Sequence, residues 1–167
     1  MRKVLLFMAM MACFHTALMA GTDKHKGTIA VNYHFVYSQC TFNKVKATTY
    51  FARKKDKGAS LKKRIARAFI NSANNNSMRH KGFVLSNASK SRYEVLIYLQ
   101  AVDDDGEHEV VGKVYKKGTK SVIKIVKVHT KGGRGDSMES QLIERLENSG
   151  EKFGDELVDD VLDDLYD

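Results

Sequence analysis

Apolar and polar positions alternate most regularly over residues 92–130, where the chain is predicted to form three successive strands. Tight turns with Gly106 and Gly118 separate the apolar runs, and glycine accepts the positive φ that short hairpin turns require. The pattern therefore predicts an antiparallel meander. The runs of β-branched and aromatic residues are 92–102, 109–115 and 121–129.

A further strand is predicted over residues 27–37, where large apolar side chains alternate with small or polar ones. This alternation indicates a strand with one face in the core. Residues 83–85 suit a small additional strand, and residues 38–56 fit either a second strand or an irregular crossover. The predicted core face of the first strand consists of Ile29, Val31, Tyr33, Phe35 and Tyr37.

Residues 60–73 show the spacing of an amphipathic helix, with Ser60 as the predicted N-cap. One side of this helix is apolar and much of the remainder is basic, which indicates a helix that packs against a sheet by one face. The apolar stripe consists of Leu61, Ile65, Ala68, Phe69 and Ser72.

A second helix is predicted from residue 138 to the end of the chain. Asp136 and Glu139 have the spacing of a capping box, with Asp136 as N-cap and Glu139 at the third helical position. The apolar residues repeat mostly every four positions, so they drift around the helix. Gly150 and Gly154 suit either a close approach to the sheet or a bend.

These elements predict an α+β fold, with an antiparallel or mixed four- to five-stranded sheet and two helices packed on one face. The chain has 167 residues, which suits a single domain. We assign residues 21–167 to this domain, in the order strand, helix, three-stranded meander and long C-terminal helix.

Residues 1–20 have the three-part pattern of a signal peptide: a basic start, an apolar run and a small residue at the predicted cleavage point. Cleavage after Ala20 would export the chain to the periplasm or the cell exterior. One alternative is lipoprotein processing, which would anchor the chain through Cys13, and the other is a buried N-terminal helix. Cleavage after Ala20 would leave Cys40 as the only cysteine, either a buried small hydrophobe or a thiol that pairs between chains.

Charge is distributed very unevenly along the chain. Residues 21–134 contain 24 basic and 8 acidic residues (+16), whereas residues 135–167 contain 2 basic and 12 acidic residues (−10). We expect the acidic helix to pack against the basic body.

The first helix carries a candidate site for anionic surfaces, such as lipid headgroups or lipopolysaccharide phosphates. The alternative is a solvated helix face, or neutralisation by the acidic helix. A nucleic-acid partner is not expected, because no basic-aromatic recognition module is present. The expected partner is an envelope protein or an anionic envelope component, with peripheral membrane association as one mode. The candidate residues are Lys62, Lys63, Arg64 and Arg67.

No catalytic motif stands out, so we expect a non-catalytic interaction module without a cofactor or metal. The acidic turn at residues 103–105 lacks the spacing of a calcium loop. The alternative function is a small secreted hydrolase acting on an anionic polymer. It would need at least two of four histidines in one cleft: His34, His80, His108 and His129.

The chain resembles small bacterial envelope proteins and lipoproteins whose fold is like the amino-terminal domain of TolB and the curli-assembly lipoproteins. The resemblance rests on the first strand, a helix ending at residues 67–71, a strand at residues 93–101 that leads into an acidic turn, and a final helix carrying residues 150–154. It spans residues 28–165 and implies an α+β interaction module of the periplasm or cell surface, with no catalytic residues to transfer.

Overall fold

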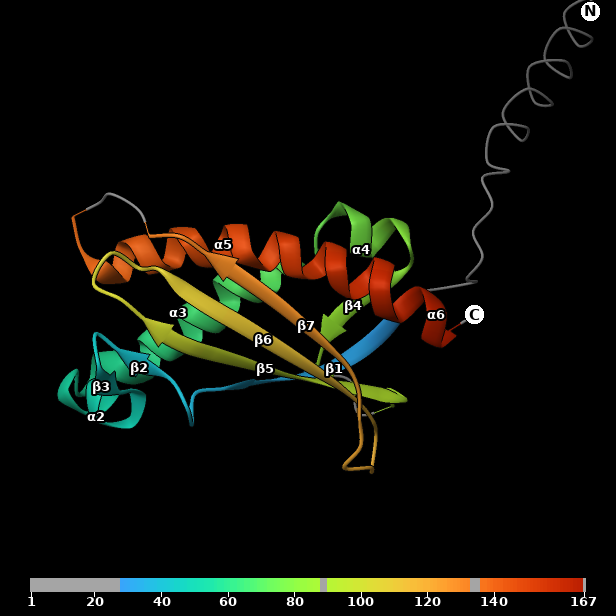
Figure 1. Ribbon diagram of the computed structural model, residues 1–167, viewed down its shortest axis with the longest axis horizontal. Coiled ribbons are helices and arrows are strands. Elements are labelled where there is room, and N and C mark those ends of the chain that lie inside the picture. The colour runs from blue at the N-terminus through green and yellow to red at the C-terminus, as the bar shows by residue number, and fades with distance from the viewer. Residues whose placement is uncertain (1–27, 88–89, 133–135, 167) are drawn as a thin grey trace, which may run out of the picture.

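The computed structural model describes residues 28–87, 90–132 and 136–166. The predicted signal peptide, residues 1–20 with Cys13, lies outside the described residues. The described elements form a mixed sheet with helices against one face, as the sequence predicts (Figure 1).

The sheet has seven strands rather than the four or five expected. The additional strands are short. Two come from the segment 38–56 that the sequence left ambiguous, and the predicted small strand at residues 83–85 is present. The strands are β1 (Ile29–Val36), β2 (Thr41–Phe42), β3 (Val45–Lys46), β4 (Phe83–Ser86), β5 (Tyr93–Val102), β6 (His108–Lys116) and β7 (Val122–Thr130).

Strand β5 lies at the centre of the sheet. β1 and then β2 pair with it in parallel, while β6 pairs with it antiparallel. β4 adds in parallel to β1, and β7 adds antiparallel to β6. The predicted meander is therefore confirmed, and β7 is an edge strand. The two turns of the meander contain Gly106 and Gly118, whose φ angles of 79° and 80° are those that the hairpin pattern requires.

The helices lie mainly on one side of the sheet, where α3 and α5 make the most extensive contact between any two elements of the described fold (Figure 1). After α5 the helix continues through a π-helical turn, η1. This wider turn accommodates the drift of the apolar positions, because Val158, Val161 and Leu162 all remain buried. The helical segments are α2 (Ala47–Arg53), α3 (Asp56–Ala73), α4 (Asn76–His80), α5 (Met138–Leu157), η1 (Val158–Leu162) and α6 (Asp163–Tyr166).

A continuous apolar core fills the space between the sheet and the two long helices. Phe69 on α3 contacts both Phe35 on β1 and Phe153 on α5, with ring centroids 5.6 Å and 5.2 Å apart. The predicted stripe of α3 supplies Leu61, Ile65 and Phe69 to this core. Burial of such side chains is the main favourable term in folding.

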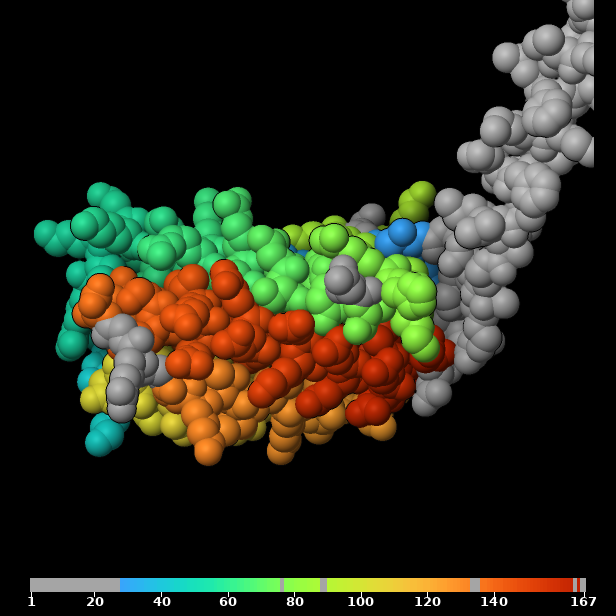
Figure 2. Space-filling model, turned by 90° about the horizontal axis from the view of Figure 1, so that it is seen from above, coloured from blue at the N-terminus to red at the C-terminus, as the bar shows by residue number. Residues whose placement is uncertain are grey.

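Gly150 and Gly154 permit a close approach, but to helix α3 rather than to the sheet. A Cβ atom at Gly150 would overlap the carbonyl oxygen of Phe69, and one at Gly154 would overlap that of Ala73. Figure 2 shows α5 lying along α3 over the length of the molecule. The glycines therefore set the distance between the two helices.

The predicted start of the first helix and the predicted N-cap of the second are wrong, although the second helix begins at Met138 as expected. Helix α3 begins at Asp56 instead of near Ser60, because the preceding turn places Lys55 at φ 50° and Gly58 against the backbone of Phe51. Helix α5 is capped by Ser137 instead of Asp136.

The cap at Ser137 also changes the role expected for Glu139. The Ser137 hydroxyl accepts a hydrogen bond from the backbone N–H of Ser140 at 3.2 Å. Glu139 is therefore free of the capping role and contacts α2 instead.

Candidate functional site

The α3 basic face, which we define as Lys62, Lys63, Arg64 and Arg67, is exposed on the helix surface away from the core. The apolar stripe of α3 is turned inward, so the positions between its members project into solvent. The aliphatic part of Lys62 lies along the protein, with Nζ 4.8 Å from the centre of the Phe51 ring. The four cations are thus all exposed, with Lys62 on the side of α3 that faces Phe51 of α2.

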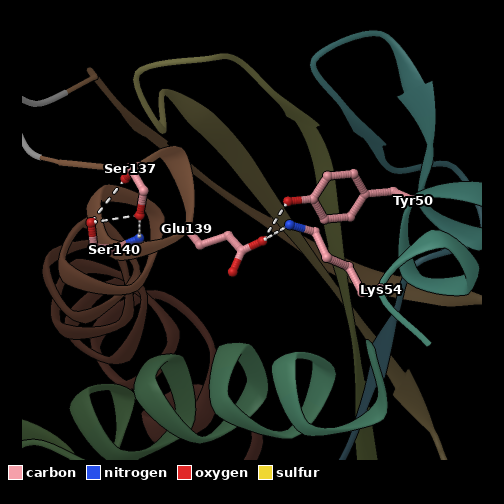
Figure 3. A network of polar contacts seen from close by, with 5 residues as sticks. All are labelled: Tyr50, Lys54, Ser137, Glu139 and Ser140. Atoms are coloured by element: carbon pink, nitrogen blue, oxygen red, sulfur yellow. Dashed lines mark hydrogen bonds and ion pairs between the residues drawn. The ribbon is translucent and has the colours of Figure 1, made fainter. Parts of the chain in front are cut away.

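The acidic C-terminal helix packs against α3, as expected, but the ion pairs of its described residues form with cations outside the α3 basic face. Glu139 Oε1 lies 2.5 Å from Lys54 Nζ and accepts a hydrogen bond from the Tyr50 hydroxyl at 2.9 Å (Figure 3). Asp163 pairs with Lys81 at 2.5 Å. Contact between α3 and α5 is instead apolar, so helix packing leaves the basic face exposed.

The pair at Glu139 shifts the ionisation of both partners. The Lys54 ammonium holds the pKa of Glu139 below its usual value, with the Tyr50 hydroxyl adding to the effect. The hydrogen bond to Glu139 raises the pKa of Lys54. Burial and the neighbouring carboxylate raise the pKa of Tyr50. The contact connects α2 to the start of α5 and has a structural role.

A second basic surface lies on the β6–β7 hairpin and was missed by the sequence analysis. We define the basic hairpin as residues 113–131. It contains seven lysines and no acidic residue. The sequence does carry a signal for it, because these residues, which span parts of two neighbouring predicted strands, contain only positive charges. These lysines are more widely spaced along the chain than the four cations of α3.

The basic hairpin also exposes aliphatic side chains. Val122, Ile123 and Ile125 on β7 are 42%, 42% and 47% exposed, and they are the large hydrophobic residues most open to solvent among those described. Val126 and Val128 on the same strand are buried towards the helices. The start of β7 is therefore exposed on both faces, and the two faces differ only from Ile125 onward.

The sheet face opposite the helices carries a mixture of apolar, aromatic and basic side chains. Leu96, Lys113 and Ile125 are aligned across three strands of this face. Lys113 Nζ lies 5.1 Å from the centre of the Tyr98 ring, a cation–π contact. Burial, with smaller contributions from Tyr98 and Glu94, raises the pKa of Tyr115.

The four histidines considered for a hydrolase occupy different environments. His108 points into the core and is 2% exposed, whereas His34 and His129 lie on the opposite sheet face and are exposed. His129 is 3.4 Å from Glu107, and His80 lies on α4. This placement does not gather a nucleophile, base and acid in one cleft.

A polar depression of about 440 Å³ lies where α3, α4 and α5 meet. Its asparagines have structural roles. The Asn74 side chain bonds both backbone groups of Leu85, and Asn75 caps α4 while donating to Asp155. Because these hydrogen bonds connect neighbouring elements, the depression is a structural junction.

Cys40 is the free cysteine of the described part of the chain, and it is 2% exposed. Burial raises the pKa of its thiol to about 12, which keeps it protonated. Of the two roles that the sequence left open, the structure places Cys40 as a buried small hydrophobe.

Across the described ranges, no group of three or more histidine, cysteine or acidic side chains could hold a metal ion. A search of the same residues for a helix long and apolar enough to cross a membrane also finds none.

No protein-family model matches the chain, and no curated protein sequence matches it significantly. Among solved structures, it is similar to the PelC dodecamer from Paraburkholderia phytofirmans, with 12% identity, a TM-score of 0.43, and coverage of 78% of this chain and 89% of that chain. A variant of that PelC gives 11% identity, a TM-score of 0.40, and coverage of 77% and 90%. Protein XCC0632 from Xanthomonas campestris, described by the family model DUF330, gives 12% identity, a TM-score of 0.37, and coverage of 79% and 82%. The expected resemblance to TolB and the curli-assembly lipoproteins is not shown, and these distant similarities concern the general fold alone.

Proposed function

We propose that this chain is a non-catalytic interaction module of the bacterial envelope, and that its α3 basic face binds an anionic envelope component. The observation that supports this most directly is the exposure of all four cations of that face beside an acidic helix. The acidic helix lies against α3, yet its described ion pairs are made with Lys54 and Lys81, and Arg64 acts on Glu139 only through its charge.

The close spacing of the α3 cations affects both the stability of the fold and the attraction of anions. Like charges gathered on one helix repel each other and weaken the folded state, while they raise the local concentration of anions near the surface. The alternative is that the charged surface serves only to keep the protein in solution. A binding role predicts that anion affinity depends on these four positions more than on the net charge.

Export of the module is supported by the charge and hydropathy pattern of residues 1–20. An exported location would place the α3 basic face among the phosphate-bearing and acidic polymers of the envelope. The hydrolase alternative gains no support from the positions of the histidines, since His108 is buried in a hydrogen-bonded contact.

The proposal can be tested by salt elution from immobilised heparin, which serves as a soluble polyanion without an apolar phase. The test variant changes all four residues of the α3 basic face to Gln. The matched control removes four exposed cations elsewhere, through Lys46→Gln, Arg79→Gln, Lys90→Gln and Lys152→Gln.

We expect the α3 variant to elute at clearly lower salt than both the control and the unmodified chain, because anion binding by exposed charges is screened by salt. Equal losses in the two variants would mean that retention follows net charge, and the α3 basic face would then not be a binding site.

A further inference from the structure

The basic hairpin combines three features: a run of lysines without acids, a long exposed stretch, and exposed aliphatic side chains. It has seven lysines and no acid over residues 113–131. Every residue from 116 to 125 is exposed. Its aliphatic residues Val122, Ile123 and Ile125 are each more than two-fifths exposed.

The hairpin projects from the body of the protein. In Figure 1 the turn between β6 and β7 extends away from the helices, below the remainder of the sheet. Helix α5 covers the later part of β7, where Val126 and Val128 are buried, but leaves the earlier part open. A flat surface could therefore reach the hairpin before it met the helices.

Protection of an edge strand accounts for only part of this arrangement. Lysines on an exposed edge hinder pairing with other chains, which explains cations at Lys124 and Lys127. It does not explain the exposed aliphatic side chains beside these lysines, because such side chains increase the tendency to associate. A partner that accepts both cations and aliphatic groups fits the surface better.

We propose that the basic hairpin docks on the surface of an anionic lipid bilayer. The lysines contact lipid phosphates, and Val122, Ile123 and Ile125 enter the boundary between headgroups and acyl chains. Interfacial binding of this kind combines apolar burial with attraction to anionic lipid.

Charge favours lipid over a second copy of the chain. In a two-fold pairing along β7, each copy would place its lysines against those of the other, and this repulsion opposes association. A soluble polyanion would neutralise the lysines but would leave the aliphatic side chains in water. An anionic bilayer satisfies both groups.

The charge on the opposite side of the molecule is consistent with this orientation. Seen from above in Figure 2, α5 and its continuation share the surface with α3 and α4, and this is the side away from the hairpin turn in Figure 1. Docking through the hairpin therefore holds the acidic helix away from anionic lipid. The exposed acids of this helical segment include Glu144, Glu147, Glu151, Glu156, Asp159 and Asp160.

This inference is independent of the proposed function, because it uses residues outside the α3 basic face. The experiment is co-sedimentation with vesicles of phosphatidylcholine alone or of phosphatidylcholine mixed with phosphatidylglycerol. It uses the chain from residue 21 onward, which contains every described element and lacks the apolar run of the predicted signal peptide.

Two hairpin variants separate charge from apolar contact. Lys120→Gln, Lys124→Gln and Lys127→Gln together should weaken partitioning into the anionic vesicles about 100-fold, at roughly fivefold for each lysine. Val122→Thr, Ile123→Thr and Ile125→Thr together keep β-branched side chains on the strand and should weaken it roughly tenfold. Thermal unfolding followed by circular dichroism checks that both variants remain folded.

Lys46→Gln, Arg79→Gln and Lys152→Gln together provide the matched control, because they remove three exposed cations outside both basic surfaces, and this variant should lose less binding than the lysine variant of the hairpin. We expect strong binding to the mixed vesicles, weak binding to pure phosphatidylcholine, and release at high salt. The proposal is overturned if the unmodified chain does not bind the anionic vesicles, or if the control variant loses as much binding as the lysine variant of the hairpin. It is equally overturned if the threonine variant binds like the unmodified chain, or if sedimentation shows that the same aliphatic residues join copies of the protein instead.

Discussion

His108 and Ser149 form a buried hydrogen bond between the sheet and helix α5, with His108 Nε2 2.9 Å from Ser149 Oγ. The other ring nitrogen, Nδ1, lies 2.8 Å from the carbonyl oxygen of Gly106. Because that carbonyl can only accept, Nδ1 carries the proton, and Nε2 of the neutral ring accepts from the Ser149 hydroxyl. Burial lowers the pKa of His108, which favours this neutral form.

The protein should lose stability as the pH falls through the ordinary titration range of histidine. The folded-state pKa of His108 lies below the unfolded value of about 6.5, so the unfolded chain binds the proton more readily. The contribution of His108 is therefore fully present above that value and is lost as the pH decreases. Urea denaturation at a series of pH values should show a smaller slope of unfolding free energy against pH for His108→Gln.

The exposed His34 provides the control for this pH dependence, because His34→Gln removes a histidine from the surface. It should leave the slope close to that of the unmodified protein. Identical slopes for His108→Gln and the unmodified protein would show that His108 makes no contribution to acid sensitivity.

Gly154→Ala should destabilise the fold by roughly 1–3 kcal/mol, the usual cost of overpacking a well-packed contact. The added Cβ would meet the Ala73 carbonyl, so α5 would have to move away from α3. At an exposed helical position the same change would instead stabilise by about 1 kcal/mol. Chemical denaturation should reveal the reversed sign.

Asn148→Ala is the matched helical control, because Asn148 is exposed on the same helix. We expect it to be neutral or slightly stabilising. A gain in stability from Gly154→Ala would contradict the close contact between the two helices.

The features that could be predicted from the sequence are those that a short stretch of neighbouring residues specifies. Apolar alternation and turn glycines located the meander, and the spacing of Leu61, Ile65 and Phe69 identified the buried side of α3. Each signal lies within a few residues of the structure that it specifies. The one-sided helix layer followed from the two apolar stripes.

The features that the sequence did not reveal depend on distant contacts. Strands β2 and β3 have two residues each, too few for any periodicity, and exist because β2 continues beside β5. The role of Gly154 depends on Ala73, far away in the chain. The exposure of Ile125 likewise depends on where α5 stops covering β7, so the second basic surface emerges only from the fold.

Glu139→Gln should have only a modest effect on stability, below about 1 kcal/mol. Its partner Lys54 is largely exposed, and solvent screens such pairs. A double-mutant cycle with Lys54→Gln, measured at low and high salt, gives the coupling energy. A coupling of several kcal/mol that is insensitive to salt would contradict a partly solvated pair.

Cys40 should resist thiol reagents in the folded protein. Its burial and its raised pKa, about 12, both suppress the reactive thiolate. Labelling with 5,5′-dithiobis(2-nitrobenzoate) at mildly alkaline pH should therefore proceed only as the protein unfolds. Rapid labelling without denaturant, or a disulfide-linked dimer on a non-reducing gel, would rule out the buried role.

The central claim is that helices cover one face of the sheet and leave the other face open. Ile125 and Val126 test it most directly, because neighbouring residues of a strand point to opposite faces and these two are 47% and 4% exposed. The measurement is the rate of thiol labelling of Ile125→Cys and Val126→Cys in the chain from residue 21 onward. We predict rapid labelling at position 125 and protection at position 126, whereas equal rates, or faster labelling at position 126, would contradict the one-sided fold.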